Sequence, residues 1–212
     1  MTAHPSFKQR LIRRGVRQFG HPRGLPGRLA GWVMGHRPSN VRRNRWAVAL
    51  LDVQPADRVL EVGFGPGVAI AELARRATAG RVYGVDHSAV MARQARRRNA
   101  AAVRAGRVTL VHTSVDRLPG LGAPLDAVLA VNSLGFWTDQ GQRLAALRAL
   151  LRPGGRIALV SQPRAPGADA ATTARAGRDL AERLTEAGFA DIRVETLPLD
   201  PPVVCVLAVR PA

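Results

Sequence analysis

The sequence is poor in several residue types, and each scarcity excludes a class of protein. Its 212 residues contain one cysteine, Cys205, so no internal disulfide can form, and we expect a reducing, cytoplasmic location. No apolar run approaches the roughly 20 residues of a membrane-spanning helix. The basic N-terminus lacks the apolar segment of a secretory signal, and we expect no metal site. These absences favour an intracellular globular protein.

Acidic residues are absent before Asp52, although the chain as a whole carries a net charge of +17. Lys8 is the only lysine among 32 basic residues, which indicates a coding bias of the source genome. We therefore do not take the overall charge as a sign of nucleic-acid binding. Residues 1–45 nevertheless hold eleven lysines and arginines, and this cluster needs its own explanation.

Two regions of the chain differ in pattern. Residues 1–50 are basic and rich in Gly and Pro, which predicts a helical N-terminal cap, with a helix expected to start after Ser39 as its N-cap. In residues 51–212, strand-like apolar runs alternate with helical patterns, and this alternation predicts an α/β fold with a parallel sheet covered on both faces. Gly188 is expected to end the last helix. The strands are expected near 58–63, 81–86, 107–112, 125–132, 155–161, 191–197 and 203–210, and the helices near 67–78, 88–102, 139–151 and 170–187.

A glycine-rich turn follows the first predicted strand and opens into a helical pattern. Its glycines are Gly63, Gly65 and Gly67. Such a turn lets a ligand approach the backbone, and the unpaired N–H groups of the helix start favour an anionic group. A dinucleotide or S-adenosylmethionine (SAM) meets these conditions. The dinucleotide fingerprint needs Gly or Ala where this chain has Val68, which disfavours an oxidoreductase.

The pattern Glu61-x-Gly63-x-Gly65-x-Gly67 resembles motif I of the class I SAM-dependent methyltransferases, and segments 82–86, 125–132 and 147–157 resemble further elements of that family. The resemblance implies a Rossmann-like, doubly wound, seven-stranded, mostly parallel sheet, SAM as cofactor and S-adenosylhomocysteine (SAH) as product. It implies these cofactor-binding residues: Glu61, Gly63, Gly65, Gly67, Asp86, His87, Met91, Ser114, Val115 and Asn132.

In this family the carboxylate at the position of Asp86 accepts hydrogen bonds from both ribose hydroxyls, and the positions of His87 and Met91 flank the adenine. Many relatives also carry an acid after the third strand, where this chain has Thr-Ser-Val at 113–115. A neutral hydroxyl makes a weaker contact than a charged group. Three alternatives for the adenine contact stay open: the Ser114 hydroxyl, the Val115 backbone and the Asp116 carboxylate.

Methyl transfer from a sulfonium mainly requires an acceptor in line and the exclusion of water, so a dedicated base is optional. The candidate catalytic residues, for positioning or as a base, are His21, His36 and Trp137. The candidate substrate contacts are Asn40, Arg43, Trp46 and Phe136. Trp137 could instead pack in the core, and the two histidines could instead lie on the surface. Arg43 fits a carboxylate clamp, and its alternative role is ordinary surface charge.

The nucleobase-amine methyltransferases of this superfamily carry an Asn/Asp-Pro-Pro-aromatic signature after the fourth strand. Residues 132–135 read Asn-Ser-Leu-Gly instead. This difference argues against methylation of nucleobase nitrogens.

Residues 6–19 predict a basic amphipathic helix with its apolar side chains on one half and its arginines on the other. Three interpretations compete. The helix is a lid over the SAM pocket, an interfacial helix on anionic lipid, or an arm that binds RNA phosphates. We favour the lid, because Gly15 and many later Gly and Pro residues interrupt a long membrane helix.

We therefore expect a SAM-dependent methyltransferase that acts on an oxygen, nitrogen or carboxylate of a small organic or peptide acceptor, in a pocket formed with the cap. The first alternative is a phospholipid or quinone-type methyltransferase at the membrane surface. The second is a non-catalytic SAM-binding protein with an RNA-binding arm, although nucleic acid is not the expected partner. The acceptor's identity and the oligomeric state stay open, a dimer included.

Overall fold

A seven-stranded sheet forms the centre of the computed structural model, which describes residues 36–122 and 124–212. The predicted lid at 6–19 and His21 lie outside these residues. The strand order is β3-β2-β1-β4-β5-β7-β6; β7 pairs antiparallel with both β5 and β6, and the other neighbouring strands pair in parallel. The strands are β1 (Arg58–Val62), β2 (Arg81–Asp86), β3 (Val108–His112), β4 (Leu125–Val131), β5 (Leu151–Ser161), β6 (Ala190–Leu197) and β7 (Val203–Val209).

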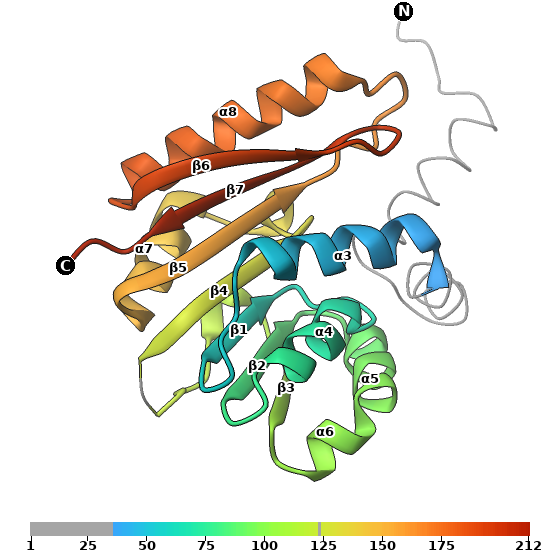
Figure 1. The fold of residues 1–212 in the computed structure, drawn as a ribbon, viewed down its shortest axis with the longest axis vertical. Helices are drawn as coiled ribbons and strands as arrows, with labels where there is room; N and C mark the ends of the chain where they lie inside the picture. Colours follow the sequence, from blue (N-terminus) through green and yellow to red (C-terminus); the bar gives the residue numbers. More distant parts are fainter. Residues whose placement is uncertain (1–35, 123) are drawn as a thin grey trace, which may run out of the picture.

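Helices cover both faces of the sheet (Figure 1). They are α3 (Pro38–Leu50), α4 (Val68–Arg76), α5 (Ala89–Arg98), α6 (Ala100–Arg104), α7 (Gln140–Leu150) and α8 (Ala170–Glu186). The predicted Rossmann-like, doubly wound arrangement is thereby confirmed. Among the described helices, none is long and apolar enough to cross a bilayer.

The alternation of side chains along each strand creates two apolar layers. In β4, Leu129 and Val131 belong to the layer that also contains side chains of α3, α4 and α5. Val128 and Ala130 belong to the opposite layer, with side chains of α7 and α8. Successive strand residues point to opposite faces, so a strand covered on both sides reads as a continuous apolar run. The sequence of β4, Leu-Asp-Ala-Val-Leu-Ala-Val, has this character.

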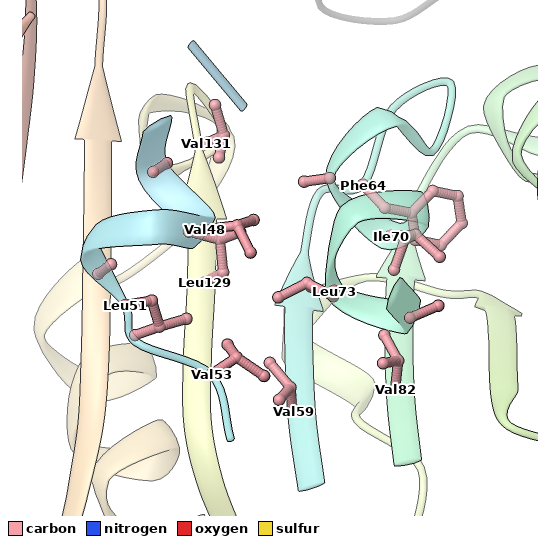
Figure 2. Close-up of a cluster of buried hydrophobic side chains, with 14 of the residues drawn as sticks. Val48, Leu51, Val53, Val59, Phe64, Ile70, Leu73, Val82, Leu129 and Val131 are labelled. Atoms are coloured by element: carbon pink, nitrogen blue, oxygen red, sulfur yellow. The ribbon is translucent and has the colours of Figure 1, made fainter. Parts of the chain in front are cut away.

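Helix α3 packs on the same face of the sheet as α4 (Figure 1). Its last turns place Ala47, Val48 and Leu51 in the core, fully buried. Figure 2 shows Val48 and Leu51 beside the side chains of β4 and of the segment that leads into β1. The described part of the cap is thus part of the sheet's own core, while the proposed boundary at residue 50 stays a prediction.

Three local expectations were wrong. Helix α3 begins at Pro38 rather than after Ser39, because the fixed φ of proline suits the first helical position. The helix expected at 88–102 is broken at Asn99, whose side-chain amide donates to the carbonyls of Ala95 and Gly67. Strand β5 starts at Leu151 instead of 155, since Leu151 already pairs with β4.

Gly188 ends α8 as predicted. It has φ +80° and follows the cap residue Ala187. Its N–H donates to Thr185, and the next N–H, of Phe189, donates to Leu184. This is the pattern of hydrogen bonds in which a left-handed residue closes a helix.

Replacing Leu51 by Ala should destabilise the whole domain rather than α3 alone. The side chain is fully buried, so we expect a loss of about 2 to 5 kcal/mol in the free energy of unfolding. Urea unfolding followed by circular dichroism measures it, and Leu50→Ala, at a partly buried position, is the matched control with a smaller loss. A separate early transition for α3, with an unchanged main midpoint, would contradict the packing described here.

Candidate functional site

A cavity of about 1140 Å³ lies along the edge of the sheet where the parallel strands end. Each of the five parallel strands β1 to β5 contributes the residue that directly follows its end. These residues are Gly63 after β1, His87 after β2, Thr113 after β3, Asn132 after β4 and Gln162 after β5. The strand order reverses between β1 and β4, and open α/β sheets bind ligands in the crevice at such a point.

The glycine turn after β1 forms one wall of this cavity. Gly63 has φ +78°, and a side chain there would collide with Ser133, whose hydroxyl donates to Val62 O at 2.6 Å. Gly65 has φ +52°, and a Cβ there would meet nothing within 4 Å. The turn thus packs tightly against the loop after β4, while the open side at Gly65 leaves room for a ligand to approach the backbone.

Asp86, the last residue of β2, holds the glycine turn in place. Its Oδ2 accepts the N–H of Gly65 at 2.8 Å and its Oδ1 accepts the N–H of Ser88 at 2.8 Å. Burial raises the pKa of Asp86, and the two N–H donors oppose that shift. A carboxylate has about four acceptor positions, so this one can still accept hydroxyl groups of a ligand in the cavity.

Glu61 is a buried acid in the same wall. Its side chain sits under the turn with the residue only 2% exposed, and Oε2 has no hydrogen-bond partner. Burial, with the charge of Asp86 adding, raises the pKa of Glu61 well above 4.5. Burial therefore favours the protonated form of this acid, and its Oε2 has polar capacity that the protein itself leaves unused.

The loop after β3 carries the three candidates for the adenine contact. The Ser114 hydroxyl donates to Asp116 Oδ2 at 2.8 Å, and Arg143 Nε lies 2.9 Å from Asp116 Oδ1. The Asp116 carboxylate is thus engaged, and it is not among the residues that line the cavity, whereas Ser114 and Val115 are. The geometry favours Ser114 and Val115.

Aromatic side chains lie on the loops after β2 and β4. The rings of His87 and Phe136 are 6.4 Å apart and tilted by 42°, and both residues are exposed, Phe136 by 53%. Trp137 is buried in the layer beneath α7 and also lines the cavity. Core packing and a place in the cavity wall, weighed as alternatives from the sequence, are therefore both found for Trp137.

A polar network closes the end of the cavity next to α3. The Gln162 N–H donates to Asn132 Oδ1 at 2.7 Å, and its Nε2 donates to Pro201 O at 2.8 Å. Gln162 Oε1 accepts from Arg43 Nη1 at 2.7 Å and from Arg164 Nη2 at 3.0 Å. The network joins α3 to the ends of β4 and β5.

Most of the predicted site residues come together in this cavity. Its lining includes Asn40, Arg43, Glu61, Gly63, Gly65, Asp86, His87, Met91, Ser114, Val115, Asn132, Phe136 and Trp137.

Three predicted residues that the structure describes do not line the cavity. Gly67 begins α4 with φ +77°, and a side chain there would lie 2.8 Å from the Ala95 Cβ, so it serves helix packing. Trp46 is partly buried against the core, and His36 is exposed.

Sequence reasoning missed further polar residues of the lining, among them Arg37, Gln162 and Arg164. Gln162 and Arg164 follow the predicted fifth strand by one and three residues, and the rule that sites form at the carboxyl ends of parallel strands points to them.

Comparison with known proteins decides the family. A family model described as a methyltransferase domain matches residues 59–155. YdaC, a methyltransferase of Bacillus subtilis (strain 168), is 32% identical over 185 residues, which are 87% of this chain and 99% of that protein. The chain belongs to the class I SAM-dependent methyltransferases.

Two further similarities agree with this assignment. The N-methyltransferase NodS of Bradyrhizobium japonicum WM9, solved with SAH, shares the fold at a TM-score of 0.68 and 18% identity, over 85% of this chain and 92% of its own. Trans-aconitate 2-methyltransferase of Pseudomonas aeruginosa (strain PAO1) is 35% identical over 121 residues, which are 55% of this chain and 41% of that protein.

SAM is the cofactor of this methyltransferase, and the residues present fit it. The open side at Gly65 admits a ligand to the backbone, Asp86 retains acceptor capacity for ribose hydroxyls, and the partnerless oxygen of Glu61 offers a further polar contact. These three features lie in one wall of one cavity.

The raised pKa of Glu61 predicts how stability depends on pH. Above the ordinary value of 4.5, the folded state keeps a proton that the unfolded chain has released. The folded state then binds more protons, so the free energy of unfolding falls as pH rises. Glu61→Gln imitates the neutral acid and removes this titration. Its melting temperature relative to the natural protein should therefore increase as the pH rises above about 4.5.

Differential scanning calorimetry over that pH range measures the effect. Glu182→Gln, on the exposed side of α8, is the matched control and should follow the natural protein. Parallel melting profiles for Glu61→Gln and the natural protein would show that Glu61 does not titrate differently in the two states.

Proposed function

We propose that this methyltransferase moves the methyl group of SAM to a small organic acceptor bound between the strand ends and α3. One observation carries the proposal: the glycine turn and Asp86 line the same cavity as Asn40 and Arg43 of α3. An acceptor held by α3 therefore shares one cavity with the cofactor. Proximity and the exclusion of water are what methyl transfer needs from a protein.

SAM, when bound, supplies a methyl group on a positively charged sulfur, and a lone pair of the acceptor displaces that sulfur to leave SAH. Asp86 would orient the ribose by accepting hydrogen bonds from its hydroxyl groups, and Trp137 would form part of the cavity wall. Arginine and amide side chains such as Arg43, Asn40 and Gln162 do not take up protons at neutral pH. These three side chains therefore cannot serve as a base toward the acceptor.

The polar side chains beside α3 support an acceptor that carries a polar group at that end of the cavity. The similarity to a trans-aconitate 2-methyltransferase, whose named substrate is a small organic acid, points in the same direction. For the lipid-surface and RNA-arm alternatives, the relevant segment at 6–19 lies outside the described residues.

Asp86→Ala should weaken binding of SAH by about tenfold or more, equivalent to about 1.4 kcal/mol. The variant loses the ribose contacts and the acceptor that holds Gly65. Asp86→Asn keeps one side-chain oxygen, so its affinity for SAH should lie between those of the natural protein and Asp86→Ala. Isothermal titration calorimetry compares these with Glu182→Ala as the neutral surface control. Unchanged affinity in Asp86→Ala would remove Asp86 from the cofactor site.

The acceptor class is tested with SAM that carries a deuterated methyl group. The full chain is incubated with a host extract, and mass spectrometry searches metabolites, peptides, lipids and RNA for the label. We expect labelled small molecules, absent with Asp86→Ala. Label found in lipids or RNA alone would contradict a small organic acceptor and favour one of the alternatives.

A further inference from the structure

Three arginines converge at the end of the cavity next to α3. Arg37 and Arg43 come from the start and the first half of α3, and Arg164 follows β5 by three residues. Arg43 and Arg164 both donate to the same oxygen, Gln162 Oε1, at 2.7 and 3.0 Å. Two guanidinium groups that share one neutral acceptor lie close together and repel each other.

No acid compensates these charges within the described residues. None of the ion pairs found there involves Arg37, Arg43 or Arg164. Asp179 and Asp200 line the cavity, but both are exposed and neither forms an ion pair with an arginine. Positive charge is therefore concentrated at this end of the cavity without a partner.

Arg43 is the most confined of the three. The residue is only 6% exposed, and its Nε is buried without a hydrogen-bond partner. Burial, together with the charges of Arg164 and Arg37, lowers the pKa of Arg43 to about 9. Burial and Arg37 also lower the pKa of Arg164. A buried cation without a counter-charge is costly, and a bound anion would offset that cost.

The network around Arg43 fixes the orientation of its guanidinium plane. Nη1 donates to Gln162 and Nη2 donates to Asn40. Gln162 is itself held at two points, by Asn132 and by the carbonyl of Pro201. A guanidinium has five N–H donors, so three of them are not used by these two hydrogen bonds. Donors that are already oriented lose little entropy when an anion binds.

We infer that Arg43, Arg164 and Arg37 bind an anionic oxygen group, carboxylate or phosphate, of the methyl acceptor. That the anion belongs to the methyl acceptor rests on the proposed function, whereas the anion site itself rests on the arginines alone. Planar guanidinium groups match these oxyanions with paired hydrogen bonds. The site selects acidic acceptors and repels amines, and it holds the acceptor by its charged end while the cavity leads to the glycine turn.

Calorimetric titration of the SAH-loaded full chain tests the site, with sodium malonate as the carboxylate probe and inorganic phosphate as the other. Ionic strength is held constant with sodium chloride. Arg43→Gln and Arg164→Gln should each weaken binding of the better probe by about tenfold or more, through loss of charge-assisted hydrogen bonds. Arg164 is partly exposed, so that variant keeps the test valid if Arg43→Gln fails to fold.

Arg97→Gln, at an exposed position of α5, is the matched control with the same change of charge and should bind the probes as the natural protein does. Preference for malonate assigns the site to a carboxylate and preference for phosphate to a phosphate. Equal affinity of all four proteins for both probes, or no binding to the natural protein, would overturn the inference.

The affinity for SAH, measured first, separates the two proposals. It should stay within about twofold of the natural value in all three variants, because the arginines belong to the acceptor end. A chain that does not bind SAH refutes the proposed function. The same titration without SAH then still decides whether the arginines bind an anion.

Discussion

The hydrogen bond from the Gly65 N–H to the Asp86 carboxylate ties together the two loops on which the cofactor site depends. β1 and β2 pair in register up to Val62 and Val85, and the Gly63 N–H extends that ladder by donating to Val85 O at 2.8 Å. The turn after β1 and the end of β2 therefore cannot shift independently. The shape of the cofactor site follows from strand pairing, and a ligand finds its backbone wall already formed.

The cavity has opposite electrostatic character at its two ends. Glu61 and Asp86 lie at the glycine turn, and burial raises the pKa of both. A cationic ligand at this end stabilises the ionised carboxylates, and the sulfonium of SAM is such a cation. The arginines beside α3 impose the reverse condition and favour an anion. With the proposed acceptor, the carboxylates therefore disfavour its anionic group and the arginines disfavour the sulfonium. The cofactor and the acceptor then each bind at one end of the cavity.

Local sequence patterns predicted the elements of the fold, and tertiary contacts account for the errors. The strands around the glycine turn and the helices α4, α7 and α8 follow from apolar periodicity and from breakers such as Gly188. The break at Asn99 does not, because the amide that replaces helical hydrogen bonds also reaches Gly67, 32 positions earlier. The start of α3 was misplaced because a suitable cap residue, Ser39, stood next to a stronger signal, Pro38.

The cofactor half of the site could be predicted because its residues fall in short segments that each resemble a family motif, whereas the acceptor half is assembled from segments without such a motif. Arg43 and Gln162 are 119 positions apart and meet only because β5 lies beside β4 and α3 packs over both. In a chain with so many arginines, residue type alone does not separate Arg164 from surface charge. The position of Arg164 shortly after β5 does distinguish it, because residues that follow parallel strands lie at the crevice whatever their type. Strand order is therefore the information that this half of the site requires.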